Sequence, residues 1–106
     1  MAEPGSGTEI TVTVRYFAAA RAGAGVAEEA LTVSTAHAPP RGRANDGPRE
    51  PSVGTVLEAA IGRHGLGLAT VLRRCSFLLD EVAVHGTDTR VRAGQVLDVL
   101  PPFAGG

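Results

Sequence analysis

The feature that most constrains the fold of this chain is the run Val-Leu-Asp-Val-Leu at residues 96–100, which is followed directly by Pro101 and Pro102. A short, mostly apolar run next to turn residues is typical of a buried central strand. Proline fixes φ and lacks a backbone donor, so this strand cannot continue its hydrogen-bond ladder. The sequence therefore predicts that residues 101–106 leave the sheet as an extended tail, with the carboxylate of Gly106 at its accessible tip.

Further strands are predicted on both sides of one helical region. Residues 10–16 alternate apolar and polar side chains and are rich in β-branched residues, which predicts a strand with one apolar face. A second strand at 27–33 follows closely enough to favour an antiparallel hairpin. Short strands are predicted at 75–79 and 82–84. The apolar face of the first strand consists of Ile10, Val12, Val14 and Tyr16.

Residues 52–65 carry the principal helix, because their apolar side chains recur at helical spacing. Either Ser52 caps its N-terminus or Thr55 and Glu58 form a capping box, and Gly65 stops the helix in a left-handed conformation. The stripe that faces the core consists of Val53, Leu57, Ala60, Ile61 and His64.

Smaller elements complete the predicted core. Residues 17–22 are expected to form no more than a short helical turn, because glycines follow them. A further helical turn at 68–74 places Leu68 and Leu72 toward the core. Phe17 and Phe77 are also assigned to the core.

The order strand, strand, helix, strand, short strand, strand gives an α+β fold with a single main helix to cover the sheet. If the first and last strands pair, they run parallel, and the helix lies in a right-handed crossover between them. This arrangement is the β-grasp, or ubiquitin-like, mixed sheet packed against one helix.

At 106 residues the chain suits one domain, residues 1–106, with a single core. Residues 1–8 are expected to be a flexible N-terminus. Residues 34–51 combine prolines with small polar residues and arginines and predict a disordered or mobile insertion. A rival interpretation is that the insertion's Arg41, Arg43 and Arg49 engage an acidic partner surface.

Composition excludes several functional classes. The formal net charge is −1, and the chain has neither a basic stripe nor many aromatic side chains, so nucleic-acid binding has little support. No apolar run is long enough to span a bilayer, and residues 1–8 do not resemble a signal peptide, so we expect a cytoplasmic protein. All ten basic residues are arginines, so the chain has no lysine to accept a carboxyl conjugate.

Other reactive side chains favour structural roles. His37, His64 and His85 lack carboxylate or cysteine neighbours at metal-ligand spacing, so no metal site is predicted. Cys75 is interpreted as a small buried hydrophobic residue rather than a nucleophile. The adjacent acids at residues 80–81 are interpreted as a solvated turn rather than a catalytic pair.

The chain resembles the ubiquitin-like sulfur carriers, the family that includes the small subunit of molybdopterin synthase and the thiamine sulfur carrier; it is most similar to the former. The resemblance covers most of the chain outside residues 1–8 and 34–51. It rests on the opening strand ending in Tyr-Phe-Ala at 16–18, the helix start Ser-Val-Gly at 52–54, and the last turn and strand running into Pro-Pro-Phe-Ala-Gly-Gly at 101–106.

The resemblance implies that Gly106 is the reacting residue. A separate activating enzyme would use ATP to adenylate its carboxylate, and a sulfur donor protein would supply the sulfur of a C-terminal thiocarboxylate. This chain has no phosphate-binding loop ending in Gly-Lys-Ser/Thr, so it is expected to bind no cofactor and to act as a carrier, not a catalyst. The large subunit of molybdopterin synthase would receive the tail and build half of a dithiolene. The residues expected to dock the partner and thread its channel are Pro101, Pro102, Phe103, Ala104 and Gly105.

Phe103 has an independent claim to a binding role, because an aromatic side chain beyond the last strand has little core left to fill. Its alternative is folding back onto the sheet. Three other functions stay open for the whole chain: a sulfur carrier for thiamine or cysteine biosynthesis, a ubiquitin-like modifier joined to target lysines through Gly106, and an interaction module with an inert tail.

Overall fold

The computed structural model describes residues 9–34 and 51–102. The predictions for residues 1–8, for His37 and the arginines of the insertion, and for Phe103 to Gly106 therefore lie outside the described residues. The elements in chain order are β1 (Glu9–Tyr16), α1 (Ala18–Ala24), β2 (Glu28–Ser34), α2 (Val53–His64), α3 (Leu66–Leu72), β3 (Ser76–Leu79), β4 (Val82–Ala83) and β5 (Val96–Leu100).

The strands form a five-stranded mixed sheet in the order β2-β1-β5-β3-β4. β1 pairs with β5 in parallel, with Val14 opposite Leu97, and every other neighbouring pair is antiparallel. The predicted parallel pairing of the first and last strands is confirmed, and β5 occupies the centre. This α+β arrangement is the predicted β-grasp fold.

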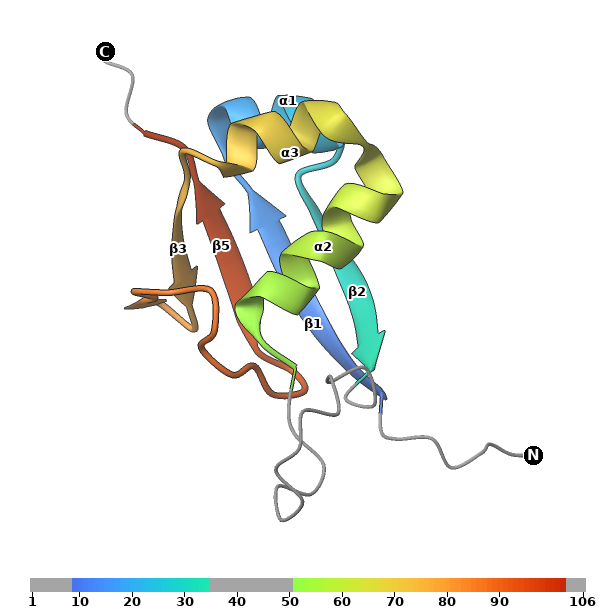
Figure 1. The fold of residues 1–106 in the computed structure, drawn as a ribbon, viewed down its shortest axis with the longest axis vertical. Coiled ribbons are helices and arrows are strands. Elements are labelled where there is room, and N and C mark those ends of the chain that lie inside the picture. Colours follow the sequence, from blue (N-terminus) through green and yellow to red (C-terminus); the bar gives the residue numbers. More distant parts are fainter. Residues whose placement is uncertain (1–8, 35–50, 103–106) are drawn as a thin grey trace, which may run out of the picture.

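The helices cover one face of the sheet, and Figure 1 shows α2 crossing that face while α1 and α3 lie near its upper end. Side chains that alternate along β1 and β5 meet the helices to make one core. The fully enclosed side chains are Val12, Val14, Ala20, Val53, Val56, Ala60, Leu68, Val91, Leu97 and Val99. None of the helices within the described ranges is long and apolar enough to cross a membrane.

The two ends of α2 are defined by side-chain and backbone chemistry. The Ser52 hydroxyl oxygen accepts a hydrogen bond from the Thr55 backbone N–H at 3.2 Å, which confirms the Ser52 cap and leaves the alternative capping box unused. Gly65 ends the helix at φ 96° and ψ −172°. Its φ is positive, as predicted, but its ψ lies outside the left-handed helical region. Val56 is buried beside the predicted stripe.

Two predictions for the segment after β1 are wrong. The short turn predicted at 17–22 is a seven-residue helix, α1, which ends only at Gly25, in the left-handed conformation. Phe17, assigned to the core, is 40% exposed. It follows the core residue Tyr16 on extended backbone, so its side chain lies on the opposite side of the chain. Phe77 is partly buried against the core, and Leu68 and Leu72 face it as predicted.

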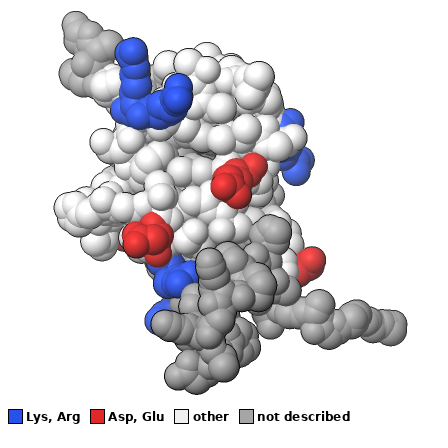
Figure 2. Space-filling model, viewed as in Figure 1, with Lys and Arg blue, Asp and Glu red and all other residues white. Residues whose placement is uncertain are grey.

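Charged side chains are spread over the helix-covered face. Figure 2 shows acidic groups over the middle of α2 and toward the lower end of the molecule, and a group of basic side chains over the end of α3. Figure 2 also shows basic side chains at the right edge and toward the lower end, so the described charges of this face form separate groups rather than a stripe.

Candidate functional site at the end of the central strand

The end of β5 is held on both sides, which fixes the direction in which the chain leaves the sheet. The Val99 carbonyl accepts a hydrogen bond from the Phe17 backbone N–H at 3.2 Å on the β1 side, and Leu100 is paired with Ser76 on the β3 side. Pro101 is partly buried and Pro102 is exposed. The predicted stop of the sheet at the two prolines agrees with the end of β5 at Leu100.

Phe103, Ala104, Gly105 and Gly106 follow this point and lie outside the described residues, so their predicted roles in docking and sulfur transfer stay predictions. Figure 1 shows that β5 ends on the same side of the molecule as α1 and α3. The surface surrounding the start of the tail therefore combines the end of the sheet with parts of both short helices.

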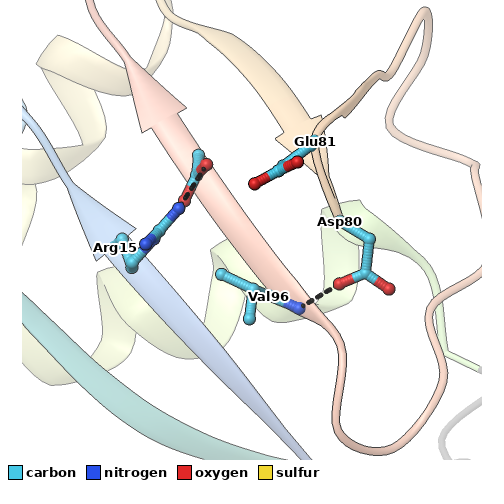
Figure 3. A pocket seen from close by; sticks show the side chains of 5 residues that line it. Arg15, Asp80, Glu81 and Val96 are labelled. Carbon is cyan, nitrogen blue, oxygen red and sulfur yellow. Dashed lines mark hydrogen bonds and ion pairs between the residues drawn. The ribbon is translucent and has the colours of Figure 1, made fainter.

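The face of the sheet opposite the helices carries an ion pair beside this point. Arg15 donates from Nε to Asp98 Oδ1 at 2.6 Å and from Nη2 to Asp98 Oδ2 at 2.9 Å. Figure 3 shows the Arg15 side chain reaching from β1 toward β5. The hydrogen bond to Asp98 raises the pKa of Arg15 above its ordinary value. Asp98 is only 5% exposed, although it lies outside the apolar core.

Sequence reasoning missed this pair. One signal was available, because Asp98 is the acidic residue in an otherwise apolar strand, and an acid that is buried in a central strand needs a partner. The identity of the partner follows from the register, which places Arg15 directly opposite Asp98. The Arg15 guanidinium also lies 5.9 Å from the centre of the Phe17 ring.

A hollow of about 270 Å³ lies next to the ion pair and is lined by Arg15, Asp80, Glu81, Val96 and Asp98. Asp80 is used structurally, since its carboxylate accepts hydrogen bonds from the Val96 backbone N–H at 2.9 Å and from Gln95 Nε2 at 3.1 Å. Asp80 and Glu81 both have positive φ and connect β3 to β4, so the predicted turn is confirmed. Two acids of this hollow, Asp80 and Asp98, therefore have structural roles in the sheet.

A second polar cluster surrounds Glu29 on the other side of the molecule. Its Oε2 atom accepts a hydrogen bond from the Tyr16 hydroxyl at 2.6 Å and lies 2.6 Å from His64 Nε2, while Arg63 Nε lies 3.2 Å from Oε1. His64 therefore has a structural role, as predicted. Its carboxylate partner was missed because the two residues are 35 positions apart in the sequence.

Cys75 lies between α3 and β3 rather than in a strand. Its thiol donates a hydrogen bond to the Val71 carbonyl, with sulfur and oxygen 3.3 Å apart, and partial burial raises its pKa above the ordinary value. A raised thiol pKa reduces the reactive thiolate fraction, which agrees with the predicted structural role.

Comparisons with known proteins support the fold, and the match to one family model extends over the tail. The ThiS family model matches residues 40–106. The small archaeal modifier protein SAMP1 from Haloferax volcanii has 21% identity and a TM-score of 0.69, over 91% of this chain and 99% of that one. SAMP1 from Methanosarcina acetivorans has 20% identity and a TM-score of 0.68, over 94% of this chain and 100% of that one.

A putative molybdopterin converting factor subunit 1 from Pyrococcus furiosus has 24% identity and a TM-score of 0.58, over 89% of this chain and 99% of that one. These structures share the fold at low identity, and the search of curated proteins found no match. Since the family model covers more than half of the chain, including the end of β5 and the tail, the chain belongs to the ThiS family of ubiquitin-like sulfur carriers.

Proposed function

We propose that this chain carries sulfur as a thiocarboxylate on Gly106 and delivers it to a partner enzyme. The observation that carries the proposal is the position of β5, a central strand paired on both sides that ends at Pro101 and Pro102. A terminus that follows such a strand has a fixed starting point and direction. Two terminal glycines without Cβ atoms suit passage through a narrow channel.

The chemistry requires activation, because a carboxylate is a poor acyl electrophile. In the proposed first step a Gly106 carboxylate oxygen attacks the α-phosphorus of ATP on the activating enzyme, and pyrophosphate leaves. Sulfide supplied by a donor protein then attacks the acyl carbon of the adenylate, the bond to AMP breaks, and a thiocarboxylate remains. This chain contributes the carboxylate and its presentation, while the catalytic groups and the ATP site belong to the activating enzyme.

We propose molybdenum cofactor biosynthesis as the pathway and the large subunit of molybdopterin synthase as the receiving partner. Support comes from the resemblance of the tail and from two structures with the same fold. One is the converting factor subunit from Pyrococcus furiosus, and the other is a complex of subunits 1 and 2 of the molybdopterin-converting factor from Helicobacter pylori, at 22% identity and a TM-score of 0.54. Thiamine or cysteine biosynthesis is the alternative destination for the sulfur. Both routes place the protein in the cytoplasm.

A second candidate function is conjugation to other proteins, which is favoured by the fold shared with two proteins named small archaeal modifiers. The same activated Gly106 would then be attacked by a lysine amine of a target instead of by sulfide. The absence of lysine from this chain makes it a donor in such a reaction and excludes lysine-linked chains of its own copies.

Intact-mass spectrometry tests the proposal on the full chain. After incubation with the activating enzyme of the same organism, ATP and a sulfide source, we expect the replacement of one oxygen by one sulfur, and no such change in a variant lacking Gly106. Sulfur gained by that variant would contradict the assignment of the terminus. Addition of the large subunit and its pterin substrate should return the carrier to its original mass, whereas Gly-Gly remnants on cellular lysines would favour the modifier function.

A further inference from the structure

We propose that Arg73 and Arg74 form a docking site for acidic side chains of the activating enzyme, at the mouth of the channel through which that enzyme receives the tail. We call these two residues the tail-root arginines. This inference rests on the proposed function, in which the tail enters a partner protein, and adds the surface that guides it there.

The tail-root arginines lie beside the point where the chain leaves the sheet. They connect α3 to β3, and β3 runs antiparallel to β5 with Ser76 opposite Leu100. In an antiparallel pair, the residues before Ser76 lie next to the residues after Leu100. Arg74 precedes Ser76 by two residues, so the register places the tail-root arginines near the end of β5, where Pro101 and Pro102 follow.

The backbone that carries these arginines is fixed by hydrogen bonds. The N–H of Arg74 donates to the Val71 carbonyl at 3.0 Å, and the N–H of Cys75 donates to the Leu72 carbonyl at 3.1 Å. Arg73 itself keeps helical backbone angles at the end of α3. The backbone from which both side chains extend is thus held against the end of α3.

Both arginines are exposed, and within the described part of the chain neither forms an ion pair with a carboxylate. Figure 2 shows the basic group over the end of α3, away from the acidic groups on the same face. Two adjacent exposed cations that pair with no carboxylate among residues 9–34 and 51–102 give this corner of the molecule a positive potential. The complementary surface on a partner is acidic.

The length of the tail shows whether a protein surface or a bound nucleotide contacts the tail-root arginines. Gly106 follows Pro102 by four residues, and an extended chain spans about 3.3–3.6 Å per residue, so a threaded tail carries its carboxylate about 13–14 Å beyond Pro102. ATP that reacts at the tip is therefore remote from the root. The surface that meets the tail-root arginines is the channel mouth of the partner itself.

Exposed charge pairs add little to equilibrium affinity but accelerate encounter between complementary surfaces. The tail-root arginines should therefore act mainly on the rate at which the tail enters its partner. This effect should be strong at low ionic strength and weak near 1 M salt, where the screening length is about 3 Å.

The test measures pyrophosphate release by the activating enzyme of the same organism at limiting carrier concentration, in low and in high salt. The variant is Arg73→Gln with Arg74→Gln. The matched control is Arg90→Gln with Arg92→Gln, which removes the same charge at the opposite end of β5. We expect the tail-root variant to react about tenfold more slowly than wild type at low salt, to approach wild type at high salt, and the control to behave as wild type.

Equal rates for wild type and the tail-root variant at low salt would overturn the inference, as would an equal slowing of the control or a slowing that persists at high salt. Circular dichroism of both variants checks that the fold is retained. If wild type releases no pyrophosphate beyond the background measured without carrier, the proposed function fails instead, so the two failures are distinguishable.

Discussion

At the scale of single residues, the carboxylate of Glu29 connects three parts of the core. It lies on β2 and contacts the Tyr16 hydroxyl from the end of β1 and the imidazole of His64 from the end of α2. The Tyr16 and His64 rings also meet edge to face, with centroids 6.1 Å apart. Because this carboxylate is largely buried, its hydrogen bonds offset the cost of removing its charge from water.

The tyrosine of this cluster gives a prediction for alkaline pH. Burial, and then the hydrogen bond to Glu29, raise the pKa of Tyr16 far above its ordinary value. The unfolded chain loses this proton near pH 10 while the folded chain keeps it, so the free energy of unfolding should be unchanged by this group below pH 10 and fall as the pH rises further. Urea denaturation followed by circular dichroism at several pH values measures the decline.

The control is Tyr16→Phe, which should lower the free energy of unfolding at pH 7 by about 1.5 kcal/mol, the lower part of the range for hydrogen bonds to charged groups. It should also reduce the decline above pH 10. Since the chain has a single tyrosine and no lysine, Cys75 is the other side chain that titrates in this range, and Cys75→Ser separates its contribution. A tyrosinate absorbance that appears near pH 10 in the folded protein would contradict the prediction.

Predictions for single residues were correct where they depend on neighbours in the sequence. They failed where they depend on how the strands pair. The Ser52 cap and the turn at Asp80 and Glu81 follow from short-range chemistry, and both are confirmed. The Arg15–Asp98 pair joins residues 83 positions apart, so it becomes visible only when the strand register is known. Phe17 was assigned to the core by residue type, whereas its position in the strand alternation places it outside.

At the scale of the elements, the strands and α2 were predictable because their apolar side chains recur at the strand and helix periods, and the two glycines of α2 fall outside its buried positions. The full length of α1 was not. Gly23 lies inside this helix, and a Cβ atom built on it would be 3.2 Å from the Leu68 Cα atom of α3. The glycine therefore permits the close approach of two helices, and burial of Ala20 and Ala24 between the elements offsets its low helix propensity. The length of α1 is therefore determined by tertiary packing, which cannot be inferred from the local sequence.

The end of α2 gives a pair of predictions with opposite signs. Gly65→Ala should lower the free energy of unfolding by about 1–3 kcal/mol, because its φ of 96° and ψ of −172° fall in a region that is open almost only to glycine. Gly62→Ala, three residues earlier, should raise it by about 0.5–1 kcal/mol, since an added Cβ atom meets nothing within 4 Å there. Chemical denaturation of both variants measures the difference, and stabilisation by Gly65→Ala would show that the strained backbone is not required.

At the scale of the whole molecule, the sheet has two different faces. The helices bury one face, while the other combines the Arg15–Asp98 ion pair with apolar side chains near the start of the tail. Phe17 is 40% exposed beside Arg15, Leu78 lies opposite Asp98, and Leu100 follows two positions later on the same face. A partner that receives the tail therefore meets an apolar surface on one side of its root and the tail-root arginines on another.

This arrangement predicts that Phe17 contributes to docking more than to folding. Phe17→Ala should lower the free energy of unfolding by less than about 1 kcal/mol, because it removes an exposed ring and one cation–π contact. It should weaken binding to the tail-receiving partner by on the order of tenfold to thirtyfold, as expected for an aromatic anchor at the centre of an interface.

The matched control is Leu66→Ala, which removes an 80% exposed apolar side chain from the start of α3, outside the sheet. Calorimetric titration of the partner with each variant should give a weaker Kd for Phe17→Ala and the wild-type Kd for Leu66→Ala. Equal affinity for all three proteins would place the docking surface away from the open sheet face. A large loss of thermal stability in Phe17→Ala would show that this side chain contributes to the core rather than to docking. The predicted pattern instead assigns the covered face to folding and the open face to the partner, with β5 supplying residues to both.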